Sequence, residues 1–183
     1  MNSNKKSYMQ LYFEQLECQR NEFYYQIVKR VENPWKRPLP DKWSVGETIF
    51  HLYLMIRLVK RFSVIYLPIV LPYAHLRKER PYKTEIHNIY EEYSKTKKRP
   101  MKAPFVLTPR DKLSTKYDFK NVQHLLNMET NKLKEKLANM EDHVAGQIRY
   151  PDPVANYPNI IQSIQLLAIH EQHHFDLTKR YYR

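Results

Sequence analysis

The segment from His170 to His174 reads HEQHH and contains residue types that bind metal ions. Residues four apart lie one turn apart on the same face of an α-helix, so the imidazoles of His170 and His174 can reach a single ion. The same letters match H-E-x-x-H, in which two histidines bind zinc and the glutamate is a general base. The segment therefore predicts a pair of metal ligands, with Glu171 as a candidate catalytic base or supporting group.

A catalytic zinc site usually has three protein ligands and one open position. Only nine residues follow His174, and none of them is His or Cys. Asp176, two residues after His174, points to another face of the same helix. The third ligand is therefore expected upstream, on an apolar face of another helix.

The composition favours one cytoplasmic, largely helical domain over residues 1–183. A chain of 183 residues fits a single domain, and the two glycines are too few for an all-β fold with many tight turns. The single Cys18 excludes an internal disulfide and a multi-cysteine zinc site, which suits a reducing cytosol. No signal peptide or membrane-spanning run is visible, so we expect no membrane partner.

Four segments show apolar residues at helical spacing. The first covers about residues 5–32. The second begins at Ser44, where Glu47 completes a capping box, and is expected to stop at Pro68 and Pro72. The third covers about residues 118–143, and the fourth runs from near residue 158 to the end of the chain.

The inward faces of the second and fourth segments both carry histidines. The predicted inward row of the second segment is His51, Met55, Leu58, Phe62 and Ile65. In the fourth segment, His170 and His174 follow the line of Leu167, whereas His173 lies about 100° away from His174. Burying three histidines is costly unless each finds a partner, and one shared metal ion satisfies all three. The candidate ligands are His51, His170 and His174, and the alternative is that they are separate core or interface histidines bonded to tyrosines.

Four amphipathic helices predict an all-α four-helix bundle. About ten residues join the first two helices, which permits antiparallel neighbours. About fifty residues join the second and third helices, which is enough to cross the bundle and begin again at the same end. The link lengths favour a long crossover between helices two and three.

The run WSVGETIFHL at residues 43–52, joined to a C-terminal helix with H-x-x-x-H at His170 and His174, resembles the DinB/YfiT-like family of helical-bundle metalloproteins. The resemblance covers the chain from the first helix to the end. It implies an up-down-down-up bundle in which His51, His170 and His174 hold the metal. His173 departs from the family pattern and is the alternative ligand if the helix register differs.

The resemblance also implies three functions. In the first, the protein is a thiol S-transferase in which a metal activates a low-molecular-weight thiol such as bacillithiol. In the second, it is a metal-dependent hydrolase that activates water. The third is a non-enzymatic, stress-induced bundle that binds metal or DNA. Zinc or nickel is the expected divalent ion, and manganese and iron also suit three histidines.

The basic charge raises the question of a nucleic-acid partner. The net charge is +12, and the chain holds 15 tyrosines. Residues 73–120 contain thirteen Lys and Arg but only six Asp and Glu, and this segment is also rich in proline. Because a solvated Lys-rich link explains that excess, we expect a small-molecule substrate as the main partner and leave a homodimer open.

Overall fold

The computed structural model describes residues 6–86, 88–89, 92, 103–110 and 112–182. This part of the chain is helical and contains one isolated β-bridge but no strand. Its α-helices are α1 (Tyr8–Gln26), α2 (Val45–Leu76), α4 (Phe119–Leu137), α5 (Asp142–Ala145) and α6 (Ile160–Lys179). Its 3-10 helices are η1 (Val28–Arg30), η2 (Phe105–Leu107) and η3 (Leu113–Thr115). The prediction of an all-α fold is confirmed.

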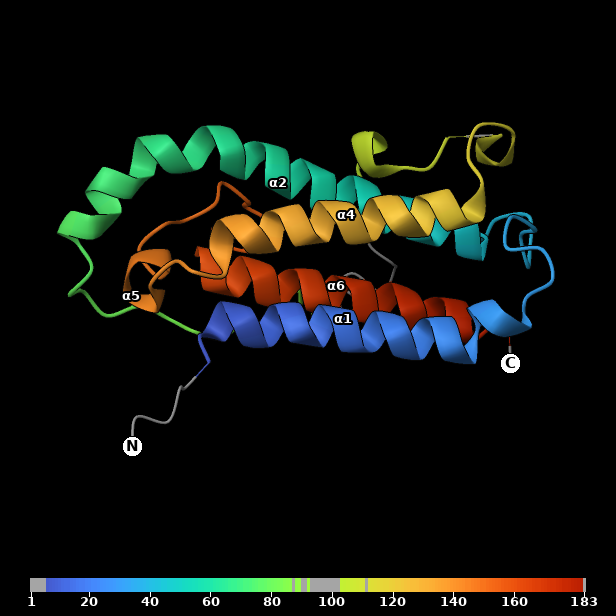
Figure 1. The fold of residues 1–183 in the computed structure, drawn as a ribbon, viewed down its shortest axis with the longest axis horizontal. Helices are drawn as coiled ribbons and strands as arrows, with labels where there is room; N and C mark the ends of the chain where they lie inside the picture. Colours follow the sequence, from blue (N-terminus) through green and yellow to red (C-terminus); the bar gives the residue numbers. More distant parts are fainter. Residues whose placement is uncertain (1–5, 87, 90–91, 93–102, 111, 183) are drawn as a thin grey trace.

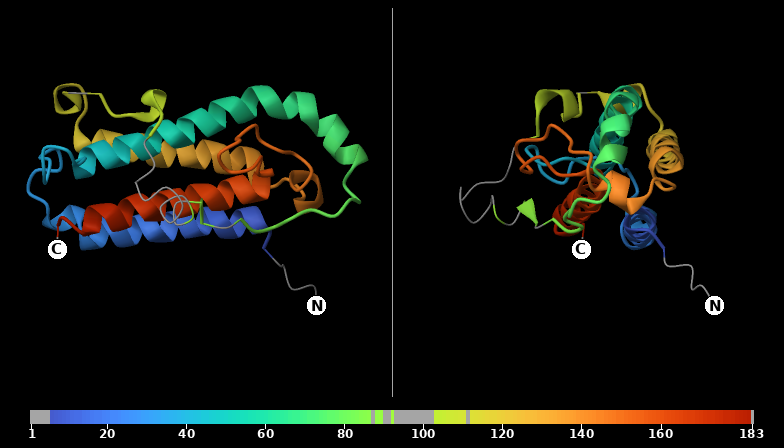
Figure 2. Two further views of the ribbon diagram at one scale, coloured as in Figure 1. Left: turned by 180° about the vertical axis from the view of Figure 1, so that it is seen from behind. Right: turned by 90° about the vertical axis from the view of Figure 1, so that its left-hand side faces the viewer.

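The four long helices lie roughly along one axis (Figure 1). Helices α2 and α4 run in the same direction, and α1 and α6 run in the opposite one. The end-on view in Figure 2 shows the four helices grouped around a common centre. Helix α2 packs chiefly against α4, and α1 packs chiefly against α6.

The core is formed where the apolar faces of these helices meet. Phe23 of α1 and Phe175 of α6 are fully buried, and their rings stack with centroids 4.1 Å apart. Helix α4 contributes a buried row at helical spacing, made of Phe119, Val122, Leu126, Leu133 and Leu137. This packing fixes α6, which carries two of the candidate ligands, against α1.

Side-chain hydrogen bonds cap the N-termini of the two helices that carry the histidines. Ser44 and Glu47 form the predicted capping box of α2, because the Ser44 hydroxyl accepts from Glu47 N–H and the Glu47 carboxylate accepts from Ser44 N–H. Asn159 and Gln162 form the equivalent box on α6. Each box satisfies two backbone N–H groups that a helix start leaves unpaired.

Helix α2 differs from the prediction in length. It continues through Pro68 and Pro72 to Leu76, so the predicted stop at the prolines is wrong. A proline inside a helix removes one N–H and crowds the carbonyl four residues earlier, which bends the helix but does not have to end it. In Figure 1 the distal half of α2 bends.

The predicted inward face of α2 is also wrong beyond its first turns. Leu58 and Ile65 are exposed, and the buried row there consists of Ile56, Ser63, Leu67 and Ala74. The buried row includes a serine and an alanine, so it is less hydrophobic than the predicted row, in which Leu58 and Ile65 are exposed. The small side chains of Ser63 and Ala74 suit close approach by neighbouring segments, and the Tyr150 hydroxyl lies 2.6 Å from the Ser63 hydroxyl.

Two other predicted helices are shorter than expected. Helix α1 ends at Gln26 and is followed by η1, whereas the prediction extended to residue 32. The predicted third helix, residues 118–143, is divided into α4 and the short α5. None of the described helices is both long enough and apolar enough to cross a lipid bilayer.

Candidate metal centre

His51 is held at a fixed place by the first two turns of α2. Every residue from Val45 to Tyr53 is buried, so this part of the helix is enclosed on all sides. Gly46 allows Trp35 to approach, because a Cβ atom at Gly46 would lie 2.5 Å from the Trp35 ring. Together with the capping box, this packing holds the start of α2 in place, and His51 with it.

Helix α6 presents His170 and His174 to His51. The ligand nitrogens of the three imidazoles all lie within 4.8 Å of one another. The ring centroid of His174 is 4.6 Å from that of His51 and also 4.6 Å from that of His170. The structure therefore brings together the three histidines that the sequence singled out.

Nε2 of His51 and Nε2 of His170 lie 2.9 Å apart. Two imidazole ligands of a tetrahedral zinc ion lie about 3.3 Å apart, given Zn–N bonds of about 2.0–2.1 Å. A change of a few tenths of an ångström would therefore convert this contact into a pair of ligands. The donor set fits a divalent transition metal, because neutral imidazoles suit zinc, nickel and iron better than calcium or magnesium.

A backbone carbonyl sets the orientation of His51. Its Nδ1–H donates to the Leu107 carbonyl, with 2.7 Å between the two atoms. Because the proton is then on Nδ1, the unprotonated Nε2 carries its lone pair toward Nε2 of His170. Metal-binding histidines commonly use their second nitrogen in this way. Sequence reasoning missed Leu107, since a carbonyl is present at every residue and gives no signal in the sequence.

Trp43 covers one side of the cluster. Its ring stacks on His174 at 5.7 Å between centroids and 14° between planes, and it also lies 4.8 Å from the His51 ring. Trp43 begins the WSVGETIFHL run, but no spacing pattern indicates that it lies beside the histidines. The indole limits the directions from which water or a ligand can approach.

Burial lowers the pKa of all three imidazoles. Burial is the main cause at His51, where the bond to Leu107 opposes it. At His170 and His174 the pKa lies well below the usual value, because burial is reinforced by the neighbouring imidazoles. Burial therefore favours the neutral form of all three side chains, which is the form that binds a cation.

His173 lies outside the cluster, although it is next to His174. It is half-buried, and its ring centroid is 5.6 Å from that of His174. Burial lowers its pKa as well. The register of α6 thus places His174, and not His173, beside His51 and His170.

Glu171 is directed away from the histidines. It is buried, and Arg20 of α1 donates to both carboxylate oxygens, from Nε at 2.7 Å and from Nη2 at 2.8 Å. Arg20 also donates to the Thr130 hydroxyl of α4 at 2.8 Å. Burial raises the pKa of Glu171, and the charge of Arg20 opposes that effect. This ion pair joins α1, α4 and α6 next to the ligands.

A comparison with protein families agrees with this arrangement. The family model described as the DinB superfamily matches residues 32–177, which is most of the chain. The chain belongs to the DinB superfamily. The matched region includes α2, most of α6 and all three clustered histidines, so the candidate metal centre of this DinB protein lies within the part that matches the family. No curated protein and no solved structure matches the chain.

Single substitutions identify the ligands. We expect His51→Ala, His170→Ala and His174→Ala each to lose most of the bound metal, because two remaining imidazoles hold an ion far less tightly than three. His173→Ala is the matched control and should keep full stoichiometry. Metal analysis of the four purified, zinc-loaded variants measures this. Full stoichiometry in any of the first three variants would remove that residue from the site.

Substitutions of the buried ion pair test how α6 is held. Arg20→Met should cost about 3–5 kcal/mol of unfolding free energy, because it leaves the Glu171 charge buried and unpaired. The double variant Arg20→Met with Glu171→Leu should recover most of that loss, since it removes both charges.

Lys6→Met is the control, because its pair with Glu14 is exposed and should contribute less than about 1 kcal/mol. Denaturant unfolding measures all three variants. A double variant as unstable as Arg20→Met alone would contradict this description of the pair.

Proposed function

We propose that this DinB protein is a metal-dependent enzyme that activates a low-molecular-weight thiol for S-transfer at the three-histidine cluster. The observation that carries the proposal is the convergence of His51, His170 and His174, with their ligand atoms within 4.8 Å. No carboxylate takes part in this cluster of described residues. Three neutral ligands would leave the full +2 charge of a divalent ion available to a fourth ligand.

A divalent ion held here would act as a Lewis acid that lowers the pKa of a thiol or water in the open position. Burial favours the neutral form of His51, and the Leu107 carbonyl, which accepts from Nδ1, fixes the direction of the His51 Nε2 lone pair. Trp43 shields one side of the cluster from solvent. In the transfer, the thiol loses its proton to solvent, its sulfur bonds to an electrophilic carbon, and the leaving group departs with the electron pair.

The contacts of Glu171 support thiol chemistry over hydrolysis. In zinc hydrolases with the H-E-x-x-H signature, the glutamate acts as general base on the attacking water. Here both Glu171 oxygens are bonded to Arg20, so the carboxylate serves to position α6. A thiol needs no such base, because its ordinary pKa of about 8.5 is already close to neutrality.

The charge of the protein is compatible with an anionic thiol. Biological thiols such as bacillithiol carry carboxylates, and the net charge of +12 attracts such molecules. The Lys-rich link between α2 and α4 is the proposed source of cations near the site. Residues 93–102 of that link, which include four lysines, lie outside the described residues.

An activity assay separates the candidate functions. With zinc or nickel bound, we expect the protein to transfer a biological thiol to a chlorinated aromatic compound, with release of chloride. His51→Ala should lower that rate by at least about a hundredfold, because the variant would lose most of the metal ion that activates the thiol. His173→Ala is the control and should keep the rate within about twofold.

The alternatives have distinct results in the same assay. Ester cleavage that needs no thiol would favour the hydrolase. Tight, salt-sensitive binding of a defined DNA sequence, without either reaction, would favour the non-enzymatic bundle. The stable double variant of Arg20 and Glu171 adds a further result: if it binds metal but has lost activity, Glu171 takes part in the chemistry.

A further inference from the structure

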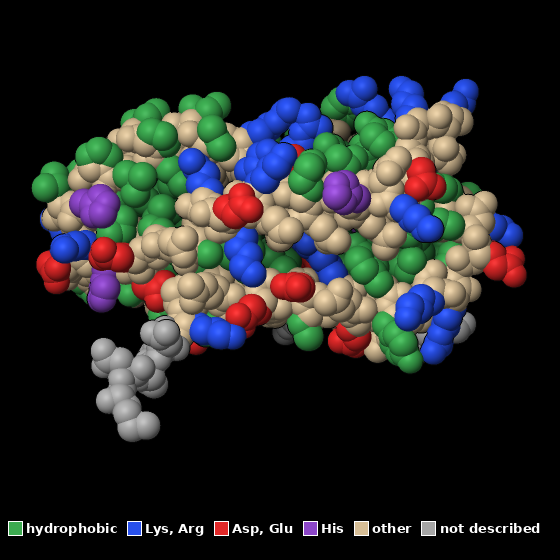
Figure 3. All heavy atoms as spheres, viewed as in Figure 1, with side chains coloured by type: hydrophobic (Ala, Val, Ile, Leu, Met, Phe, Trp, Pro, Cys, Tyr) green, Lys and Arg blue, Asp and Glu red, His purple; other side chains and the backbone are tan. Residues whose placement is uncertain are grey.

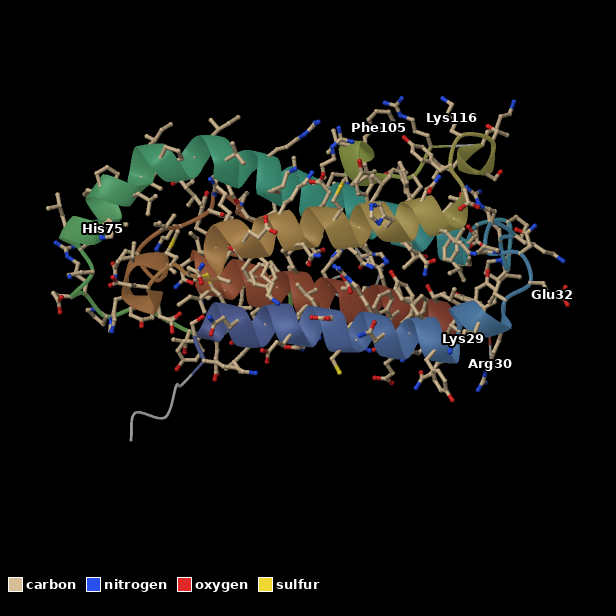
Figure 4. All side chains as sticks on the ribbon, viewed as in Figure 1. Lys29, Arg30, Glu32, His75, Phe105 and Lys116 are labelled. Atoms are coloured by element: carbon tan, nitrogen blue, oxygen red, sulfur yellow. The ribbon has the colours of Figure 1, made fainter. Side chains whose placement is uncertain are left out.

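The distal half of α2 exposes a continuous apolar face. Six large apolar residues of this helix have exposed fractions between 48% and 86%, namely Leu58, Val64, Ile65, Ile69, Tyr73 and Leu76. Figure 3 shows hydrophobic side chains gathered at the end of the molecule where the distal half of α2 lies. We call these six residues the α2 face. His75, labelled in Figure 4, marks its end, opposite to the end of the molecule where Glu32 lies.

The α2 face has the pattern of a helix-pairing surface. Four of its residues, Leu58, Ile65, Ile69 and Leu76, form one row with the exposed Pro72, which is not one of the six, at steps of seven, four, three and four residues. This is the spacing with which one helix packs along another. No charged residue occurs between Arg61 and His75, so the central part of the face carries no charge that would repel an apolar partner.

The exposed area is large enough for a stable interface. A fully exposed large apolar residue presents roughly 200 Å², and the six residues of the α2 face together expose roughly 750 Å² on that basis. A standard interface buries about 800 Å² on each partner. Apolar patches on monomers rarely exceed about 300–600 Å². The exposed apolar area of the α2 face is therefore close to the area that one copy buries in a two-fold symmetric dimer.

The structure favours a second copy of the chain as the partner. Among the described helices, α2 is the one with such a row: α1 exposes only the separated Leu11 and Tyr25, and α4 and α6 expose no large apolar side chain. In a two-fold contact the same patch occurs on both sides. We propose that two copies of this protein pair through their α2 faces.

The prolines favour a protein partner over a lipid surface. Pro68 and Pro72 have no N–H, so the carbonyls of Val64 and Pro68 on the exposed side lack their usual helical donor. Lipid chains cannot donate a hydrogen bond to them. In a second copy of the chain, the Tyr73 hydroxyl and the Arg61 guanidinium can donate hydrogen bonds to these carbonyls.

Sedimentation velocity on the full chain tests the pairing. The unmodified protein should sediment with the mass of two chains at micromolar concentration. Ile69→Glu should give a single-chain mass, because the contact would bury a charge on each copy. Val154→Glu is the matched control: Val154 is also exposed but lies outside α2, and this variant should remain paired. Leu76→Glu repeats the test at the end of the face, and circular dichroism verifies that each variant is folded.

Each other result overturns the proposal. A single-chain mass for the unmodified protein means that the face does not pair. A two-chain mass for both folded α2 variants places the contact elsewhere. If the unmodified protein is a single chain that co-sediments with vesicles containing phosphatidylserine, and Ile69→Glu does not, the α2 face binds an anionic lipid surface.

Discussion

Three clustered imidazoles between two helices, two of them buried and the third partly buried, are the constraint on which the rest of this structure depends. A buried imidazole that lacks a partner destabilises the fold, and three together cannot all become charged in the same small volume. The protein meets this constraint by keeping them neutral and directing their nitrogens to a common point. Such a cluster is matched by one divalent cation, which satisfies all three lone pairs at once.

The surrounding fold serves to hold that point in place. Capping boxes fix the starts of α2 and α6, and the stacked rings of Phe23 and Phe175 join α6 to α1. The Arg20–Glu171 pair ties α6 to α1 and, through Thr130, to α4. These contacts lie beside the histidines and do not involve them, so we expect them to hold the cluster in place without a bound ion.

The sequence predicted the clustering of the three histidines better than it predicted the length and the buried face of α2, the helix that carries His51. Spacing alone selected His170 and His174, and the capping box located the start of α2, because both depend on local periodicity. The course of α2 beyond Ile56 depends on tertiary packing, so an apolar row with larger side chains was mistaken for the buried face. The Leu107 carbonyl and the Arg20–Glu171 pair join residues far apart in the chain, and no local pattern indicates them.

The central claim is that the helices position the three histidines before any metal binds. Circular dichroism and thermal unfolding of the chelated protein, before and after zinc is restored, test it most directly. The helical signal should persist without metal, and zinc should raise stability by about 4 kcal/mol at a thousandfold excess over its dissociation constant. Loss of the helical signal on chelation would contradict the claim, because it would show that the ion builds the fold instead of binding to a site already formed.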